Sequence, residues 1–474
     1  MQETSRKCRC LFGTDGVRDV ANRGLMTPEM ALRLGRSYAL FLIERGVSRP
    51  VIAVGRDTRR SGPMIEMALV SGFLSAGAEV VSLGVIPTPG VSFAVRKLSC
   101  DGGAVVSASH NTFEYNGIKF LGRDGCKLSD DDEAEIEEYL ADVVFDDWRP
   151  TGSSVGSVAP RTGILSEYTE HVVRTCGFGV DQELSIVVDC AHGAASEAAA
   201  MIFRRCFGRA IIISDRPERN NINDGCGVIH MENVASAVLS GGHSLGMALD
   251  GDADRVLFVD TKGRIIDGDI ILWVLGRWLH GEGRLVNGVV ATVMSNKALE
   301  EKFAQDGIHL TRCPVGDRYV LDAMRSSGSS LGGEQSGHVI ASDFFPTGDG
   351  LSSGLLFLSA CSRLGEDINT LVDRFGRYPQ VLKNFHATDK ESFLGHPGVR
   401  GAIERACQEL GELGRVLVRP SGTEPLVRVL VEAREDPVLR SVSEALFEEI
   451  RRSGEEVLDR KSTRLNSSPR IRSR

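Results

Sequence analysis

The chain has no long apolar run and no excess of basic residues, and both absences narrow its class. Its longest apolar stretch, Ile270–Leu275, is far shorter than the roughly 20 residues that a membrane-spanning helix needs. The first residues, MQETSRKCRC, lack the apolar core of a signal peptide. The formal net charge of −9 argues against non-specific binding to nucleic acid. We therefore expect a cytoplasmic protein with no membrane and no nucleic-acid partner.

Two nucleotide-binding patterns are also missing. No G-x-x-x-x-G-K-[ST] occurs, which disfavours a P-loop nucleotide donor, and no G-x-G-x-x-G follows a strand-like run, which removes the dinucleotide-binding fold. The eleven cysteines include no C-x-x-C pair, and an odd number cannot all pair within one chain. We interpret them as reduced thiols, most of them buried packing residues.

The composition and the patterning indicate a large globular α/β protein. Apolar residues make up 42% and charged residues 25% of the 474 residues, a length that predicts three or four domains. Helix-period segments alternate with β-rich runs, which indicates β-α units with mixed sheets. The expected helices are 27–45 and 61–76, and the expected strands are 51–54, 80–83 and 104–106.

Similar alternation recurs at 185–259 and 288–340, so we predict three related α/β domains with mixed sheets and a smaller C-terminal α+β domain. The polar run 151–157 is expected to be a linker, and the acidic run 130–138 a solvated helix start. The expected domains are 1–150, 151–259, 260–370 and 371–460, with the active site in the central cleft. Residues 461–474 have the basic composition of a disordered tail, or of a segment foreign to the native protein.

The most informative motif is the acidic loop Leu-Asp-Gly-Asp-Ala-Asp-Arg-Val. Its carboxylates, Asp250, Asp252 and Asp254, lie between two apolar runs, 245–249 and 256–259, that are expected to be short buried strands. Three carboxylates this close repel one another unless a cation lies between them. Oxygen ligands at this density suit Mg²⁺ or a similar ion, and the alternative is a solvated turn.

A calcium loop of the EF-hand type also begins D-x-D-x-D. That loop requires Gly at its sixth position and Glu at its twelfth, where this chain has Arg255 and Thr261. The calcium interpretation therefore fails.

A second segment supplies a candidate nucleophile. Ser109 follows a small apolar strand and is adjacent to His110, while Lys119 lies on the next apolar run. Serine needs a base or a cation to act as a nucleophile. No G-x-S-x-G elbow surrounds Ser109, which disfavours acyl transfer. An isolated Ser-His pair is more often ordinary loop polarity.

Two further loops offer ligand-binding groups. In GGEQSGH, Glu334 and Ser336 can read a polyhydroxy ligand and His338 can exchange a proton near neutral pH; the alternative is a plain turn. In RPSGTEP, two hydroxyls and the backbone amides near Gly422 form, with Arg419 and Arg428, a cradle for an oxyanion. Phosphate is the expected guest, and a capped turn between strands is the alternative.

Together these loops describe phosphoryl transfer on a sugar phosphate. They are spread over more than 300 residues, so they must converge from different domains. Without a P-loop, the phosphate donor is expected to be the enzyme itself.

These motifs follow one another in the order of a known family. The chain resembles the α-D-phosphohexomutase superfamily over residues 11–435, and within it the bacterial phosphoglucosamine mutases. Gln335, Gly422 and the segment NNINDGCGVIH (220–230) favour that branch. The matching segments are FGTDGVR (12–18), SASHN (107–111), NGIKF (116–120), DGDADR (250–255), VGDRYV (315–320), GGEQSGH (332–338) and RPSGTEPLVRV (419–429).

The resemblance implies a role for each matching residue. Ser109 would be the phosphoserine that donates the phosphoryl group, and it would bind Mg²⁺ together with the three aspartates. Arg255 would face the same phosphate, and Lys119 or His338 would carry a proton. Glu334 and Ser336 would read sugar hydroxyls. The remaining cleft residues would be His110 and Arg18, and the non-reacting phosphate would be held by Arg419, Ser421, Gly422, Thr423 and Arg428.

The implied activity is an isomerase reaction, the interconversion of glucosamine 6-phosphate and glucosamine 1-phosphate through a bisphosphorylated sugar, feeding UDP-N-acetylglucosamine and cell-wall precursor synthesis. A homodimer is the oligomeric state that the resemblance suggests. The alternatives are phosphomannomutase or phosphoglucomutase activity, or a sugar-phosphate binding protein without chemistry. Three departures from the family, Thr112, Asp19 and Val228-Ile229, remove no reacting group, but Thr112 and Asp19 predict a lower rate.

Overall fold

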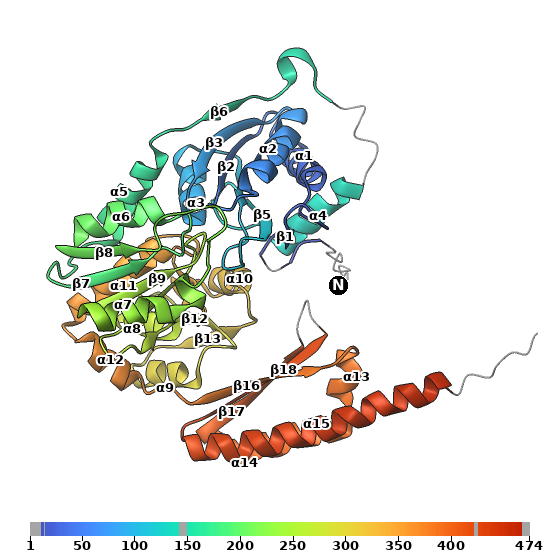
Figure 1. The fold of residues 1–474 in the computed structure, drawn as a ribbon, viewed down its shortest axis with the longest axis vertical. Coiled ribbons are helices and arrows are strands. Elements are labelled where there is room, and N and C mark those ends of the chain that lie inside the picture. Colours follow the sequence, from blue (N-terminus) through green and yellow to red (C-terminus); the bar gives the residue numbers. More distant parts are fainter. Residues whose placement is uncertain (1–10, 14, 142–148, 421–424, 467–474) are drawn as a thin grey trace, which may run out of the picture. The chain divides into compact units, whose positions relative to one another are not determined.

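The computed structural model describes residues 11–13, 15–141, 149–420 and 425–466 (Figure 1). The chain divides into two compact units. The first comprises Met1–Ser295 and Phe303–Arg374, and the second comprises Asn296–Lys302 and Phe375–Arg474. Among the described residues, no helix is long and apolar enough to cross a membrane.

The first sheet of unit 1 has the strand order β1-β5-β4-β2-β3-β6. Its inner strands are parallel, whereas β5 runs antiparallel to β4 and to β1. The strands are β1 (Val17–Val20), β2 (Val51–Arg56), β3 (Glu79–Val85), β4 (Gly102–Val106), β5 (Tyr115–Leu121) and β6 (Val158–Pro160). The helices around them are α1 (Pro28–Glu44), α2 (Gly62–Ser75), α3 (Thr88–Lys97) and α4 (Asp130–Ala141).

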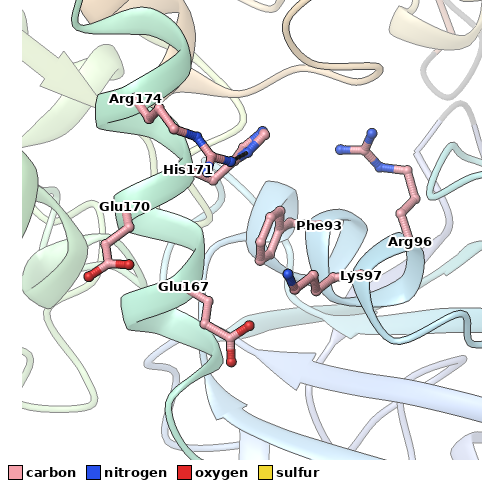
Figure 2. Close-up of a pocket in the computed structure, with 7 residues that line it drawn as sticks. All are labelled: Phe93, Arg96, Lys97, Glu167, Glu170, His171 and Arg174. Atoms are coloured by element: carbon pink, nitrogen blue, oxygen red, sulfur yellow. Dashed lines mark hydrogen bonds between the residues drawn. The ribbon is translucent and has the colours of Figure 1, made fainter.

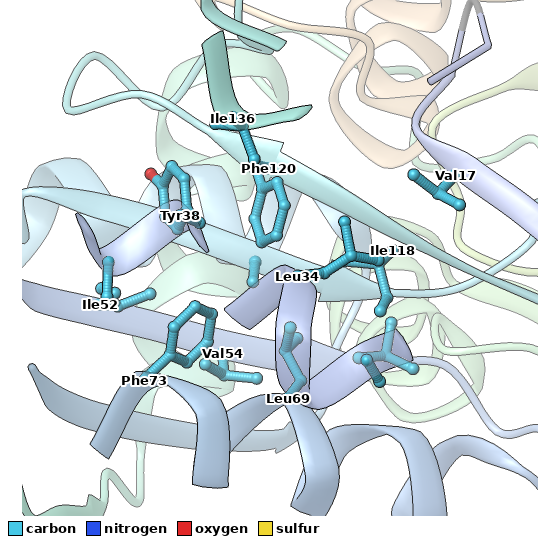
Figure 3. Packing of buried hydrophobic residues seen from close by; sticks show 14 of the residues in the cluster. Val17, Leu34, Tyr38, Ile52, Val54, Leu69, Phe73, Ile118, Phe120 and Ile136 are labelled. Atoms are coloured by element: carbon cyan, nitrogen blue, oxygen red, sulfur yellow. The ribbon is translucent and has the colours of Figure 1, made fainter. Parts of the chain in front are cut away.

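Alternate residues of β2 point to opposite faces of this sheet, so both faces need a helical cover. Ile52 and Val54 pack into a buried cluster with α1, α2 and α4 (Figure 3). The Tyr38 ring stacks on Phe120 with ring centroids 4.3 Å apart, and Phe73 meets Phe120 edge-on. Helix α3 covers the other face so closely that a Cβ at Gly103 of β4 would lie 2.7 Å from the Val95 side chain.

The second sheet has the order β11-β10-β9-β7-β8, with β9 and β10 forming an antiparallel hairpin at the end of parallel strands. Its strands are β7 (Ser185–Asp189), β8 (Arg209–Ile213), β9 (Leu245–Leu249), β10 (Val256–Val259) and β11 (Ile265–Ile266). Val234 and Val238 of α7 pack on one face, and Phe357 of α11 packs on Phe258 across the other. The helices are α5 (Ile164–Cys176), α6 (Ser196–Cys206), α7 (Met231–Gly241) and α11 (Gly350–Leu364), with a 3₁₀ turn η3 (Gly227–Ile229).

The third sheet has the order β13-β12-β14-β15 and repeats the same plan, with parallel strands that end in the antiparallel pair β14 and β15. Val320 and Met324 of α10 pack on one face of it. Its strands are β12 (Val289–Thr292), β13 (Leu310–Cys313), β14 (Leu331–Gly333) and β15 (Val339–Ala341). The associated helices are α8 (Gly268–Gly281), α10 (Asp317–Ser327) and α12 (Ile368–Phe375), and the chain boundary between the two units falls within α9 (Lys297–Gln305).

Unit 2 is a three-stranded antiparallel sheet of order β16-β18-β17 with helices on one face. Val427, Val429 and Val431 of the central strand form its core with α14 and α15. Its elements are β16 (Gln380–His386), α13 (Lys390–Gly395), α14 (Pro397–Leu410), η4 (Gly411–Leu413), β17 (Gly414–Pro420), β18 (Leu426–Ala433) and α15 (Asp436–Asn466).

The expected fold class, three related α/β domains with mixed sheets and a smaller C-terminal α+β domain, is confirmed. Three details differ. The expected linker 151–157 contains the turn η2 (Gly152–Ser154) and leads into β6, which pairs with β3, so the first sheet extends past residue 150. The acidic run does begin α4, but Glu133 is buried and bonds to Arg318 rather than being solvated.

Part of the expected disordered tail is helical. Helix α15 continues to Asn466. Because neither glycine nor proline occurs between Glu455 and Asn466, nothing in the sequence interrupts the helix there. Residues 467–474, the rest of the expected tail, lie outside the described residues.

Candidate active site

Three of the four loops singled out in the sequence occupy the same position in three sheets. The Ser109 loop joins β4 to β5, the aspartate loop joins β9 to β10, and the Glu334 loop joins β14 to β15. Each pair is the antiparallel hairpin that ends a run of parallel strands. The shared position explains how segments far apart in sequence can present polar side chains to one site.

Ser109 lies in the turn after β4 with its backbone in the left-handed region, at φ 51°, which non-glycine residues seldom adopt. Its side chain is fully buried, and its Oγ donates a hydrogen bond of 2.6 Å to Oδ2 of Asp250. The Ser109 amide donates to Oγ of Ser107 at 2.9 Å. The serine is therefore fixed against the aspartate loop.

A buried arginine holds the turn in this conformation. Arg59 Nη2 donates to the carbonyl oxygens of Ser109 (2.9 Å) and Asn111 (2.7 Å), while Nη1 donates to those of Thr112 and Tyr115. Its Nε donates to Oδ2 of Asp57 at 2.8 Å, and both side chains of this ion pair are fully buried. One planar guanidinium thus fixes four carbonyl groups of the serine turn.

A second support comes from the β7–β9 part of the chain. Asn223 Nδ2 donates to the carbonyl oxygens of Ser109 (2.8 Å) and Asn111 (2.9 Å). A Cβ at Gly251 would lie 2.7 Å from the Ser109 carbonyl oxygen, so only glycine lets the aspartate loop approach the serine turn this closely.

The three aspartates form the candidate metal centre. Oxygen atoms of Asp250, Asp252 and Asp254 lie within 4.8 Å of one another, and all three side chains are buried. Burial, followed by the charges of Asp254 and Asp252, raises the pKa of Asp250 well above its ordinary value. Oδ1 of Asp252 and Oδ1 of Asp254 are buried and accept no hydrogen bond from the described residues. Buried carboxylate oxygens without a donor fit a hard divalent cation.

Lys119 compensates part of this negative charge. Its Nζ lies 2.9 Å from Oδ2 of Asp252, 3.4 Å from Oδ2 of Asp254 and 3.1 Å from Oδ2 of Asp15. Burial opposes the charged form of this lysine, but Asp252 and Asp254 outweigh it and raise its pKa. Burial and the charge of Asp254 raise the pKa of Asp252. Lys119 and the Thr88 hydroxyl outweigh them and bring this pKa below its ordinary value.

Helix α3 also touches the aspartate loop at its first residue. Thr88 Oγ1 donates to Oδ2 of Asp252 at 2.7 Å, and the Thr88 amide donates to the Asp252 carbonyl at 3.0 Å. The first turn of α3 is thereby tied to the middle ligand of the candidate metal centre.

Arg255 and Arg18 place further cationic groups beside the serine, and His110 lies against Arg255. Arg255 Nη1 lies 3.3 Å from Nδ1 of His110. Burial, then Arg255 and Arg18, lower the pKa of His110 to about 4, so its imidazole is neutral at neutral pH. Arg18 Nη1 bonds to the Ala108 carbonyl (3.2 Å) and to Asn111 Oδ1 (3.1 Å).

The Glu334 loop is only partly joined to this cluster. His338 is buried, with Nδ1 3.9 Å from Asp254 Oδ2 and Nε2 3.7 Å from Asp317 Oδ2. Glu334 Oε1 accepts a hydrogen bond from the Gly316 amide at 3.0 Å, and its charge acts on Arg255. Ser336 is exposed at the tip of the turn, and the structure gives it no contact with the cluster.

The fourth loop belongs to unit 2. Its two arginines, Arg419 on β17 and Arg428 on β18, are directly opposite each other in the antiparallel register. Side chains at such positions lie on one face about 5 Å apart at Cβ, and like charges there repel unless an anion lies between them. Ser421, Gly422 and Thr423, the other expected members of the cradle, lie outside the described residues.

Two departures from the family pattern prove to have local roles. Asp19 accepts hydrogen bonds from the amides of Val20 (2.7 Å) and Leu25 (2.9 Å), so its charge is used in its own turn. Thr112 is not free, because its carbonyl accepts a hydrogen bond from Arg59. Val228 and Ile229 form part of η3, where Ile229 is exposed.

Sequence reasoning missed several residues of the site. Arg59 and Asp57 follow β2, a parallel neighbour of β4, and the carboxyl ends of parallel strands meet at one edge of a sheet. The position of GRDTR (55–59) at that edge was the available signal that these residues lie near Ser109. Lys127 and Asp317 form a buried ion pair beside His338, and neither segment carried a signal beyond ordinary polarity.

Comparison with known proteins places these features in a family. Four models of the phosphoglucomutase/phosphomannomutase family match the chain: α/β/α domain I over residues 9–146, domain II over 166–263, domain III over 267–378 and the C-terminal domain over 382–449. Among solved structures, a family protein of Burkholderia thailandensis is 24% identical with a TM-score of 0.79, covering 93% of this chain and 97% of that one.

Curated relatives are more similar in sequence. The phosphoglucosamine mutase of Anaeromyxobacter dehalogenans is 44% identical over 455 residues, which is 94% of this chain and 99% of the relative. The phosphoglucosamine mutase of Pelotomaculum thermopropionicum is 45% identical over 433 residues, which is 91% of this chain and 97% of the relative. With matches to all four domains and to full-length relatives, the chain belongs to the phosphoglucomutase/phosphomannomutase family.

Proposed function

We propose that the chain is a phosphoglucosamine mutase, an isomerase that interconverts glucosamine 6-phosphate and glucosamine 1-phosphate. The observation that carries this proposal is the 2.6 Å contact between Ser109 Oγ and Asp250 in a buried cluster of three carboxylates. The curated relatives of similar length, all named phosphoglucosamine mutase, supply the substrate class.

Phosphorylated Ser109 would donate its phosphoryl group to a sugar hydroxyl. The bond from phosphorus to Ser109 Oγ breaks while the bond from phosphorus to the sugar oxygen forms, and the hydroxyl proton passes to Lys119 or His338. The bisphosphorylated sugar then turns end for end and returns its other phosphoryl group to Ser109. Asp250, Asp252 and Asp254, with the phosphoserine, would hold Mg²⁺, which supplies positive charge for the transferring phosphoryl group.

Lys119 must be deprotonated before it can accept that proton, and its two carboxylate contacts oppose this because they favour the charged ammonium. A cation bound by the same carboxylates would offset their charge and lower the pKa of Lys119. His338 is the alternative proton carrier, and its Nε2 lies 3.7 Å from Oδ2 of Asp317. Arg255, with His110 against it, would face the phosphate on Ser109, and Arg18 would line the same site.

Substrate recognition is divided between two loops in this proposal. Glu334 and Ser336 would read the sugar hydroxyls and the amino group. The non-reacting phosphate would be held by Arg419, Ser421, Gly422, Thr423 and Arg428. The opposed position of the two arginines supports an anion between them. Because either phosphate must fit as the sugar turns, this cradle would read phosphate and not the sugar.

We also propose a cytoplasmic location and a homodimer. The nine cysteines that the structure describes form no disulfide, and eight of them are buried, which is typical of a reducing compartment. The homodimer rests on the family resemblance alone.

The decisive experiment compares kcat/KM for glucosamine, glucose and mannose phosphates with the purified, phosphorylated protein. We expect glucosamine phosphate to be preferred by at least about tenfold, the effect of one hydrogen-bonding contact of roughly 1.4 kcal/mol. A higher kcat/KM for mannose or glucose phosphate would overturn the substrate assignment while leaving the phosphoryl transfer chemistry in place.

A further inference from the structure

A cavity of about 400 Å³ lies between α3 and α5, and none of its lining residues belongs to the candidate active site (Figure 2). Helix α3 supplies one wall and helix α5 the other. The lining residues are Phe93, Arg96, Lys97, Glu167, Glu170, His171 and Arg174.

The cavity gathers positive charge that the surrounding protein does not neutralise. Among the described residues, Arg96 and Lys97 make no hydrogen bond or ion pair, and Arg174 bonds only to His171, with Nη2 3.4 Å from Nδ1. The Glu167 carboxylate is paired with Arg161 at 2.6 Å. Figure 2 shows the Glu170 carboxylate directed away from Phe93, on the far side of α5. The remaining charge therefore favours an anion.

Basic residues in the last turn of a helix commonly interact with its dipole, and Arg96 and Lys97 hold that position on α3. Arg174 holds the same position in the last turn of α5, but helix dipoles do not explain why cations from two different helices face one cavity (Figure 2). The pKa of His171 is lowered by burial and then by Arg174, Arg96 and Lys97, so the charges of all three cations reach the same imidazole. The imidazole is therefore uncharged at neutral pH and can donate or accept a hydrogen bond there.

The wall between the cations is aromatic. The Phe93 ring lies 5.2 Å from the His171 ring and 5.8 Å from the Tyr168 ring, measured between centroids. A narrower crevice shares Phe93, Arg96 and His171 with the cavity and contains Ser92. The Ser92 Oγ is buried and has no hydrogen-bond partner among the described residues. An apolar wall beside an unused hydroxyl suits an organic group better than a bare inorganic ion.

We propose that this cavity binds a phosphate monoester, with the phosphate between Arg96 and Arg174 and its organic group against Phe93. Two guanidinium groups from facing helices match the oxygen atoms of a phosphate in a way that a single lysine cannot. A volume of about 400 Å³ falls within the range of small-molecule sites and exceeds what one phosphate group fills.

Helix α3 links this cavity to the candidate metal centre. Its last turn carries Arg96 and Lys97, and its first residue, Thr88, bonds twice to Asp252. A ten-residue helix is a rigid rod of about 15 Å, so a shift at one end is carried to the other. The crevice adds a second link, because Tyr168 donates to Asp349, the N-cap of α11, at 2.9 Å. The amide of Gly350, the first residue of α11, donates to the Ala253 carbonyl of the aspartate loop at 2.9 Å. Occupancy of the cavity thereby changes the affinity of the aspartate loop for its cation.

Isothermal titration calorimetry with adenosine monophosphate, a hexose 6-phosphate and inorganic phosphate tests the site. We expect the Arg96→Ala/Arg174→Ala variant to bind the nucleotide at least ten- to a hundredfold more weakly than the unmodified chain, and to lose one of two sites for the hexose phosphate. The double variant Arg204→Ala/Arg205→Ala, which replaces two exposed arginines on α6, is the charge-matched control and should bind as the unmodified chain does. Tighter binding of nucleotide than of hexose phosphate would identify a nucleotide as the source of the ester, and the reverse a sugar. Unchanged binding of every probe by the double variant, or binding of inorganic phosphate alone, would overturn the proposal.

A second titration tests the coupling without relying on turnover. Mg²⁺ affinity measured by calorimetry should change when the phosphate monoester is present, and the ester affinity should change by the same factor when Mg²⁺ is present. Thr88→Val removes the hydroxyl that contacts Asp252, so it should preserve ester binding and reduce this factor. Equal Mg²⁺ affinity with and without the ester in the unmodified chain would overturn the coupling.

Discussion

Replacing Arg59 with lysine removes the planar fork that holds the serine turn but keeps a positive charge beside Asp57. In the native chain, Nε, Nη1 and Nη2 of Arg59 together serve one carboxylate and four backbone carbonyls. A lysine ammonium has three N–H donors on one nitrogen, which cannot occupy three positions at once. The Arg59→Lys variant therefore keeps the ion pair at the expense of the carbonyl contacts.

The loss of stability in Arg59→Lys depends on which backbone carbonyls still accept a hydrogen bond from another donor. Those of Ser109 and Asn111 still accept from Asn223, and that of Thr112 accepts from the Tyr115 amide. A lost hydrogen bond to a charged donor costs about 1.5–3 kcal/mol, so we expect a loss of about 2–4 kcal/mol in the free energy of unfolding. A turn displaced by roughly 1 Å also lowers kcat by about 10²-fold.

The assay pairs urea unfolding with steady-state kinetics at a temperature where the variant stays folded. Arg60→Lys is the matched control, since Arg60 is exposed and adjacent in sequence. We expect this control to change the free energy of unfolding by less than about 0.5 kcal/mol. If Arg59→Lys behaved like Arg60→Lys in both measurements, the serine turn would not depend on the arginine fork and our interpretation of these contacts would be wrong.

Four other substitutions test the proposed site. Ser109→Ala should lower kcat by about 10³-fold or more, measured by steady-state kinetics, and cost about 1 kcal/mol of stability through its lost bond to Asp250; a tenth of native activity would contradict the phosphoserine. Asp252→Asn should weaken Mg²⁺ binding, so identical Mg²⁺ titration curves for variant and native chain would contradict the metal assignment. Arg428→Ala should weaken the binding of every hexose phosphate about ten- to a hundredfold without changing the preference among sugars. It should also release more bisphosphate in single-turnover experiments. Glu334→Ala should instead alter the preference among sugars.

The local elements were predictable because their signals are local. The runs 245–249 and 256–259 were expected as short buried strands and are β9 and β10, since both are continuous apolar runs and every residue in them is buried. Membership of the family was equally predictable, because the motif segments keep their residues and their order along the chain. Helix α1, expected at 27–45, begins at Pro28 after a Thr27 cap.

Contacts between distant segments were not predictable from such patterns. Arg59 is fifty residues from Ser109 in sequence, and its position after β2 indicates a sheet edge but not which turn its guanidinium contacts. Glu133 was expected in solvent because its neighbours are acidic, yet Arg318 buries and pairs it. The charge of Asp19 was expected near an anionic substrate, but its carboxylate accepts a hydrogen bond from the Leu25 amide in its own turn. Each of these depends on which segments pack together, and a single sequence does not state that.

The left-handed backbone of Ser109 limits which residue can serve as the proposed nucleophile. At φ 51° a β-branched side chain meets its own backbone, so threonine is a poor substitute although its hydroxyl has the same chemistry. The fold thereby restricts the site to serine, and phosphothreonine chemistry is closed to it. The same constraint gives a design rule: a hydroxyl nucleophile can be exchanged at this position only if the turn held by Arg59 is rebuilt first.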